Sequence, residues 1–216
     1  MKKTIICLLA ILLCSCATPT NKMYEFKINH SDFEIPSGIL HDDHIYWEVD
    51  QEIPKDIGEK IGTLQDAVDE SHLPCSELSG TNDLKKYIGD DIYLKNQSLF
   101  LKTKDRTLTF QYITKMKLPK KISKPKDANA DAMAKPHFVY HDMIYYICNG
   151  AEVELPEHFE EVGKVKKSLF SARDNFTGNI NVGDSLFASN YQNRFMFVKN
   201  IDNQKYYMYE NEGYKY

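Results

Sequence analysis

One eight-residue pattern occurs twice in this chain, and it restricts the folds open to the chain more than any other feature. Residues 40–47 read Leu-His-Asp-Asp-His-Ile-Tyr-Trp, and residues 139–146 read Val-Tyr-His-Asp-Met-Ile-Tyr-Tyr. Each copy has an apolar residue, a polar turn, and then an isoleucine followed by two aromatic residues. A pattern that recurs in this way predicts two structural repeats, each built around the same local element.

The residues after each polar turn alternate as they do in a strand with one buried face. Ile45, Trp47 and Val49 are separated by single residues, and Ile144 and Tyr146 share a face in the second copy. This period of two predicts a β-strand, and the polar turn before each strand predicts a β-hairpin.

The order of the remaining elements also agrees between the two halves. Proline segments at 52–57 and 154–159 predict a short helical turn, and Gly62 and Gly163 then mark the start of a further strand. Each half closes with three runs typical of strands, at 89–93, 99–101 and 107–112, and at 183–187, 195–198 and 206–209. The predicted fold class is mostly β, with two tandem repeat domains at 24–114 and 136–216. Each domain is expected to be a twisted antiparallel β-sheet with a short helical turn.

The first residues have the composition of an export signal. Lys2 and Lys3 precede an apolar run from Ile5 to Leu13, which is too short to cross a bilayer as a helix. The next residues, Leu-Cys-Ser-Cys, read as a bacterial lipobox. This predicts a lipoprotein signal peptide at 1–15, a lipid such as palmitate on Cys16, and a tether at 16–23. An ordinary secretory signal and an uncleaved anchor are the alternatives. Acyl chains on Cys16 would hold the protein on a membrane, at about 0.8 kcal/mol per buried methylene.

Charge is distributed unevenly along the chain. Without residues 1–15 the net charge is −6, with −9 in residues 24–114 and −3 in residues 136–216. Residues 115–135 carry seven lysines and two aspartates, and their composition is that of a linker. This linker is expected to act as a spacer, or to lie on anionic lipid or wall polymer.

The acidic body argues against a nucleic-acid partner, which requires a basic face. It favours a cationic or neutral partner outside the cell.

Signals for metal binding and catalysis are weak. The segment His41-Asp42-Asp43-His44 has side chains that bind transition metals, but a tight site needs three or four ligands with supporting hydrogen bonds. Met143 replaces the second histidine in the other copy, which favours a solvated hairpin turn.

The glutamates around Pro156 favour a solvated face over a carboxylate pair for hydrolysis. The sequence lacks the Gly-x-Ser-x-Gly, His-Glu-x-x-His and phosphate-binding glycine motifs. We therefore expect no catalytic residue, no metal site and no cofactor.

Two cysteines besides Cys16 remain after the predicted cleavage. Cys75 and Cys148 occupy positions that do not correspond in the two repeats. Exported proteins can form disulfides, so a bond between these two residues and a pair of separate thiols are both open.

Aromatic residues form the candidate binding surface. The chain has 14 tyrosines and 11 phenylalanines. Tyr46 and Tyr145 occupy matching positions on the strand face opposite Trp47 and Tyr146. Exposed aromatic residues are favoured in binding surfaces for peptides and glycans, so these four residues are the predicted surface. The alternative is that they cover the core of a small domain and contact neighbours across the strands.

The lipobox and the segment from Ile39 to Pro54 resemble the nisin and subtilin immunity lipoproteins. The similarity is strongest in the strand–turn–strand run and in Glu52-Ile53-Pro54, and it extends to the rest of the chain only as a pattern. Uncharacterised surface lipoproteins of Gram-positive bacteria share related segments. The resemblance implies tandem domains on a lipid anchor and interception of a cationic peptide before it reaches its lipid target. No functional residue of that family can be assigned to a single position here.

These observations give one functional expectation and one alternative. The chain is predicted to be a non-enzymatic lipoprotein, anchored through Cys16 on the extracytoplasmic face of the cell membrane, or on the outer membrane in a Gram-negative source. Its expected partner is a cationic antimicrobial peptide. The alternative is a structural or interaction lipoprotein of the cell envelope that binds a cell-wall component or another protein.

Overall fold

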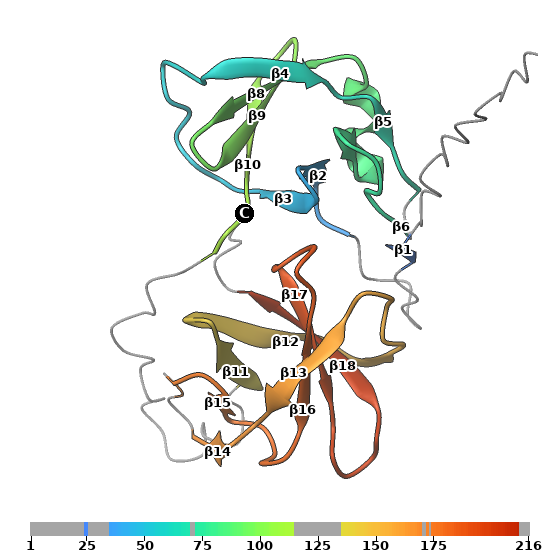
Figure 1. The fold of residues 1–216 in the computed structure, drawn as a ribbon, viewed down its shortest axis with the longest axis vertical. Coiled ribbons are helices and arrows are strands. Elements are labelled where there is room, and N and C mark those ends of the chain that lie inside the picture. Colours follow the sequence, from blue (N-terminus) through green and yellow to red (C-terminus); the bar gives the residue numbers. More distant parts are fainter. Residues whose placement is uncertain are drawn as a thin grey trace, which may run out of the picture.

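The computed structural model describes residues 24–25, 35–69, 72–114, 135–169, 172 and 174–211. They form two separate sheets of eight strands each and one two-stranded ribbon (Figure 1). The predicted fold class, mostly β with two tandem β domains, is confirmed. The signal peptide, Cys16, the tether and nearly all of the linker at 115–135 lie outside the described residues, so they stay predictions.

The first domain is the sheet whose strands lie between Gly38 and Gln111. Across the sheet the strands run in the order β4 (Glu59–Thr63), β8 (Asp91–Lys95), β9 (Ser98–Lys102), β10 (Thr107–Gln111), β3 (His44–Glu48), β2 (Gly38–His41), β7 (Ser79–Gly80) and β5 (Asp66–Ala67). Neighbouring strands are antiparallel, except for the short parallel pair β5 and β7. The separate ribbon pairs β1 (Tyr24–Glu25) with β6 (His72–Leu73).

The second domain repeats this order strand for strand. Its strands are β13 (Glu160–Lys164), β16 (Ser185–Ala188), β17 (Phe195–Lys199), β18 (Tyr206–Asn211), β12 (Met143–Val153), β11 (His137–Tyr140), β15 (Thr177–Gly178) and β14 (Lys167–Ser168). The parallel pair also recurs, between β14 and β15. A shared order that includes one unusual parallel pair supports the duplication read from the sequence.

The two hairpin turns adopt the same backbone conformation. Asp42 and Asp43 have φ values of 50° and 58°, and His141 and Asp142 have φ values of 48° and 62°. Two consecutive residues with positive φ define the tight turn whose twist matches that of the flanking strands. The opening pattern of the sequence is therefore a β-hairpin in both domains, β2–β3 and β11–β12, as predicted.

The edge strands β4 and β13 each have a register shift at a matching position. The shift lies just before Gly62 in β4 and just before Gly163 in β13. Both glycines lie near the end of their strand, although the sequence predicted that they begin one.

The short helix lies in a different place from the one predicted. The segments at Pro54 and Pro156 are irregular and lead directly into β4 and β13. The helix in the described part of the chain is a 3₁₀ helix, η1 (Asn82–Tyr87), which packs Leu84 into the first core. The first proline segment is exposed from Glu52 to Asp56, whereas the second buries Pro156 and Phe159 without forming a helix. Segments of six residues gain too few hydrogen bonds to offset the cost of nucleating a helix.

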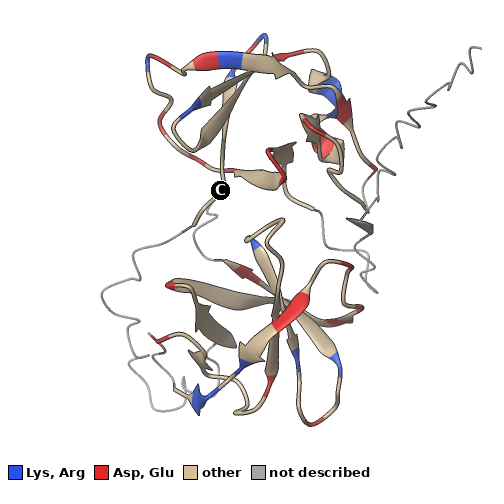
Figure 2. Cartoon of the chain, in the orientation of Figure 1, with Lys and Arg blue, Asp and Glu red and all other residues tan. Residues whose placement is uncertain are grey.

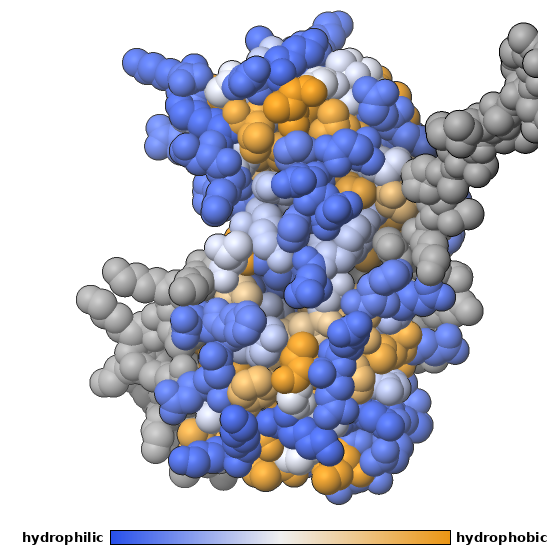
Figure 3. Space-filling view, viewed as in Figure 1, coloured by the Kyte–Doolittle hydropathy of each residue, from blue (hydrophilic) through white to orange (hydrophobic). Residues whose placement is uncertain are grey.

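Each domain has a hydrophobic core inside its own sheet. The first core contains Ile39, Leu64, Leu78, Leu84, Ile92, Leu99, Leu101, Leu108 and Phe110. The second core contains Phe138, Met143, Tyr145, Val165, Leu186, Met196, Val198 and Tyr209. On the face shown in Figure 3, hydrophilic residues cover most of both domains and leave smaller hydrophobic patches.

A third hydrophobic cluster joins the two domains. It combines Leu40, Ile45, Trp47 and Val49 from the first domain with Val153, Phe159, Phe187, Phe195, Phe197 and Met208 from the second. The Trp47 and Phe195 rings meet edge to face with their centres 5.6 Å apart. Burial of aromatic residues at this junction stabilises the contact between the domains.

Candidate functional site

The four aromatic residues predicted to form a binding surface do not lie together at the surface. Trp47 and Tyr145 are 0% and 1% exposed, so the prediction is wrong for these two. Tyr46 and Tyr146 are half-buried. The alternation around Trp47 indicated one buried face and one open face. In the structure Tyr46 packs against the first core, and Trp47 on the opposite face packs against the second domain.

The polar hairpin of the first domain is held by hydrogen bonds of its own. His41 Nδ1 lies 2.5 Å from one Glu77 carboxylate oxygen, and the Asp42 N–H donates to the other at 3.0 Å. His44 Nδ1 lies 2.7 Å from the Asp42 carbonyl oxygen, and its ring meets Tyr112 edge-on at 4.6 Å. In the part of the chain that the structure describes, no group of three His, Cys, Asp or Glu side chains is arranged to hold a metal ion.

A six-residue loop, 189–194, joins β16 to β17 and has no counterpart of that length between the matching strands of the first domain. The matching strands of the first domain, β8 and β9, are joined by only two residues, Asn96 and Gln97. This tight turn stays within its own sheet, whereas loop 189–194 reaches the first domain. The sequence contains the signal for this loop, because the strand runs around it match those of the first half while the spacing between them does not.

Backbone and side-chain hydrogen bonds connect loop 189–194 to the first domain. The Ile45 N–H donates to the Tyr191 carbonyl oxygen at 3.0 Å, and the Tyr112 hydroxyl donates to the Asn190 carbonyl oxygen at 3.4 Å. The Ile45 N–H points to the loop because β10 pairs with β3 only at the far end of that strand. The loop therefore takes the place of a neighbouring strand along the first half of β3.

Arg194 anchors the end of this loop between the domains. Its side chain is 0% exposed, and Nε and Nη2 lie 2.8 Å and 2.6 Å from Glu210 Oε1. The guanidinium carbon lies 5.5 Å from the centre of the Trp47 ring, which is a cation–π distance. Gln192 folds the loop back on itself, since its Oε1 accepts the N–H groups of Arg194 and Phe195.

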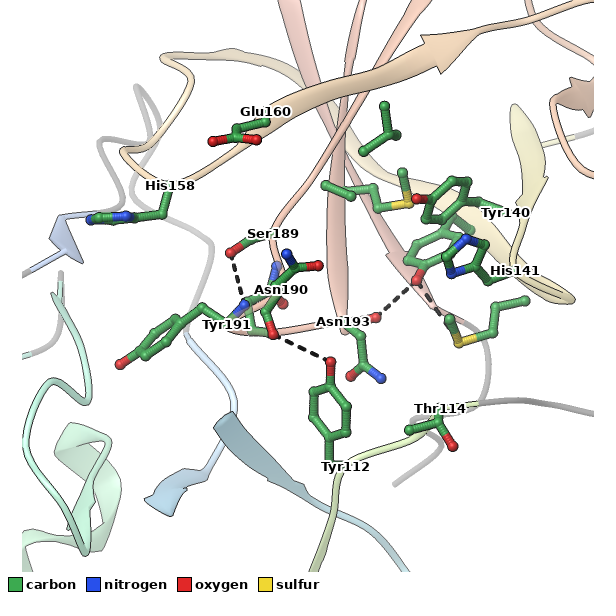
Figure 4. Close-up of a pocket in the computed structure, with 16 residues that line it drawn as sticks. Tyr112, Thr114, Tyr140, His141, His158, Glu160, Ser189, Asn190, Tyr191 and Asn193 are labelled. Atoms are coloured by element: carbon green, nitrogen blue, oxygen red, sulfur yellow. Dashed lines mark hydrogen bonds between the residues drawn. The ribbon is translucent and has the colours of Figure 1, made fainter. Parts of the chain in front are cut away.

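The same loop lines a cavity of about 490 Å³ at the junction of the domains. We call this cavity the junction pocket. Figure 4 shows Glu160 and His158 along one side of it, with Tyr140 and His141 across from them. The first domain and the loop supply most of the remaining polar lining, which is Tyr112, Thr114, Ser189, Asn190, Tyr191, Gln192 and Asn193. A cavity of this size, with a mixed apolar and polar lining, is typical of ligand sites.

The position of the junction pocket follows from the curvature of the second sheet. The edge strand β13 supplies Glu160 and Val162, and the β11–β12 hairpin supplies Tyr140 and Met143. The pocket thus lies between the edge strand of the sheet and its own hairpin, and Tyr112 and Thr114 of the first domain line one side of it. Openings at the ends of curled β-sheets are frequent ligand sites.

Tyrosine hydroxyls in the junction pocket are uncharged donors. Burial raises the pKa of Tyr112, although a hydrogen bond with Asn193 opposes this effect, and burial alone raises the pKa of Tyr140. The Tyr145 hydroxyl donates to the Asn193 carbonyl oxygen at 3.0 Å. These bonds orient the rings toward the cavity. Tyr112, which belongs to the first domain, was not among the site residues predicted from the sequence.

The fixed charge of the junction pocket is negative. Glu160 is the one carboxylate among its described lining residues, which include no lysine and no arginine. Two histidines, His141 and His158, complete the titratable groups apart from tyrosine. A neutral or singly cationic ligand group suits this lining, whereas a phosphate or carboxylate would face repulsion from Glu160 without a lysine or arginine in the lining to pair with.

The two cysteines in the described residues lie apart from the junction pocket. Both Cys75 and Cys148 are free and half-buried, so they do not form a disulfide with each other. Burial raises the pKa of the Cys148 thiol to about 12, and burial also raises the pKa of Cys75. A thiol that stays protonated is a weak nucleophile.

Comparison with other proteins leaves this pocket as the main guide to function. No known protein family, curated protein or solved structure matches this chain. The resemblance to immunity lipoproteins therefore rests on the quoted residues and stays a prediction. Within the described residues, no helix is long and apolar enough to span a membrane.

Proposed function

We propose that this protein is a non-enzymatic lipoprotein that is anchored outside the membrane through Cys16 and binds a cationic peptide in the junction pocket. The observation that carries the proposal is a cavity built by both domains and lined by tyrosines, amides and one carboxylate. Aromatic side chains are enriched at recognition surfaces, and amide side chains supply hydrogen bonds to a bound peptide. Interception of an antimicrobial peptide in this pocket would protect the cell that carries the protein.

Charge supports a cationic partner. Residues 24–114 carry a net charge of −9 and residues 136–216 carry −3. Acidic residues are spread over both domains, including the edge strand β13 that lines the pocket (Figure 2). A negative potential attracts a cationic peptide from a distance and raises its local concentration at the pocket.

Protection of a sensitive cell tests this proposal. The full-length gene is expressed in a bacterium that is sensitive to cationic lantibiotics, and the inhibitory concentration of each peptide is measured. Thr114→Trp places a large ring at the pocket from an exposed position, so it should abolish protection without disturbing a core. Lys104→Trp is the matched control, since Lys104 is exposed and does not line the pocket. No protection across a panel of peptides would refute the proposal.

A cell-wall glycan is the second candidate ligand. The amide and hydroxyl groups of Ser189, Asn190, Gln192 and Asn193 lie beside tyrosine rings in the junction pocket, and this combination also suits sugars. Retention of the wild-type protein on isolated cell wall, with loss of retention in Thr114→Trp, would favour this candidate. Retention that is unchanged in Thr114→Trp would exclude the pocket as a glycan site.

A further inference from the structure

The junction pocket contains a carboxylate that has no counter-charge in the described structure. Two other glutamates of the second domain are paired: Glu210 with Arg194, and Glu152 with Lys205. Glu160 has no ion-pair partner among the described residues, and it lies on β13 with its side chain at the cavity. An unpaired carboxylate beside a cavity is available to a cation from outside.

The neighbouring glutamate provides an internal comparison. Glu160 and Glu161 are consecutive residues of β13, and both are exposed. Successive side chains of a strand point to opposite faces, and accordingly Glu160 lines the junction pocket while Glu161 does not. The two residues thus have nearly the same charge, exposure and backbone environment, and they differ in access to the cavity.

The aromatic lining is suited to a cation as well. Tyr112 and Tyr140 supply rings to the junction pocket, and Tyr191 also lines it. An ammonium group near the face of such a ring gains about 0.5–2 kcal/mol, depending on how far it is desolvated. The nearest buried cation, Arg194, is already held by Glu210 and Trp47 and does not line the cavity. The single negative charge of Glu160 is therefore not offset by a protein cation in the lining.

We infer that the junction pocket binds the ammonium group of a lysine side chain, with the Glu160 carboxylate as its counter-charge and the tyrosine rings around its methylene stem. This inference rests on the proposed function and specifies which chemical group of the peptide enters the pocket. An amino group is small enough for the cavity, donates up to three hydrogen bonds, and meets both the carboxylate and the carbonyl and amide oxygens of loop 189–194.

Calorimetric titration of the full-length protein with tetralysine tests the inference. The control peptide is tetralysine acetylated on every side chain, which keeps the length and removes the charges. Wild type should bind tetralysine and not the acetylated peptide. Glu160→Lys should weaken binding roughly tenfold or more, and Glu160→Gln about threefold to fivefold, because an exposed ion pair contributes modestly. Glu161→Lys and Glu161→Gln should change affinity less than twofold at 0.15 M salt, where the Debye length is about 8 Å.

The outcomes separate this inference from the proposed function. Equal effects of Glu160→Lys and Glu161→Lys would overturn the inference, because the acidic surface as a whole would then attract the peptide. If Thr114→Trp abolishes binding while those two variants behave alike, the pocket still binds the peptide and only the lysine assignment fails. If Thr114→Trp leaves tetralysine binding unchanged, the pocket itself is excluded as the peptide site. Equal affinity for tetralysine and its acetylated form would also overturn the assignment.

Discussion

Replacing Glu210 by glutamine should destabilise this protein more than replacing Arg194 by methionine. The two residues form one ion pair, so a simple count of lost contacts predicts equal effects. Their surroundings differ, however. The Arg194 side chain is 0% exposed and lies against Trp47, whereas the Glu210 side chain is 31% exposed. The two substitutions therefore leave different groups behind.

The expected magnitudes follow from the group that remains. In Glu210→Gln a fully buried guanidinium loses its counter-charge, and an uncompensated buried charge costs about 3–5 kcal/mol. One hydrogen bond to the glutamine oxygen offsets part of this cost, so we expect about 3 kcal/mol. In Arg194→Met the remaining carboxylate is hydrated through its exposed side, and methionine keeps the packing against Trp47. The loss is then the cation–π contact and a partly screened ion pair, about 1–2 kcal/mol.

Urea unfolding of the purified protein, followed by tryptophan fluorescence, measures both values. Trp47 is the only tryptophan in the chain and lies at the contact between the domains. The double variant Arg194→Met with Glu210→Gln should be no less stable than Glu210→Gln alone, because removal of the cation removes the cause of the penalty. A larger effect for Arg194→Met than for Glu210→Gln would contradict the reasoning about buried charge.

Three further predictions concern the core, the junction and a thiol. Gly178→Ala should cost roughly 3 kcal/mol, because an added Cβ would lie 2.3 Å from a backbone oxygen. Gly150→Ala, at φ +72° with open space around it, should cost only about 1 kcal/mol; equal losses in thermal unfolding would refute this. Trp47→Ala should cost about 3–5 kcal/mol; calorimetry should show one unfolding transition for wild type and for Trp47→Phe, and two for Trp47→Ala. Cys148, with its pKa raised to about 12, should react with iodoacetamide at pH 8 roughly a thousandfold more slowly than free cysteine. A rate close to that of free cysteine would show that the thiol is not buried as described.

The sequence was sufficient for the architecture because both repeats carry the same local signals. Alternation at Ile45, Trp47 and Val49 reports burial on one face, and all three residues are buried. The hairpin turns, the longer strands and their matching order along the chain in the two halves follow from signals that act over a few residues. The proline segments misled the prediction, since a proline permits a helix but supplies no buried face to stabilise one.

The candidate site was harder to predict because its residues are far apart in the chain. Tyr112, Tyr140 and Glu160 come together only when the second sheet curls and the first domain packs against it. No spacing rule connects such residues. Tyr145 was assigned to the surface, but its ring packs into the core of its own domain. Trp47 was assigned to the surface for a different reason. A period-2 pattern indicates which residues of a strand share a face, but it does not show that a second domain covers the outer face.

The difference between the two copies is more informative about function than their similarity. Strands, turns and cores recur in both domains. Their presence is therefore explained by the fold that the two domains share. Loop 189–194 does not recur, since the matching connection in the first domain has only two residues. This loop is longer than a hairpin requires, it places Arg194 in a buried position, and it lines the junction pocket. Features that the fold itself does not need are expected at functional sites. Replacing loop 189–194 by Asn-Gln, the turn of the first domain, should therefore leave a folded second domain by circular dichroism and abolish ligand binding. Binding that survives this replacement would move the site away from the junction of the domains.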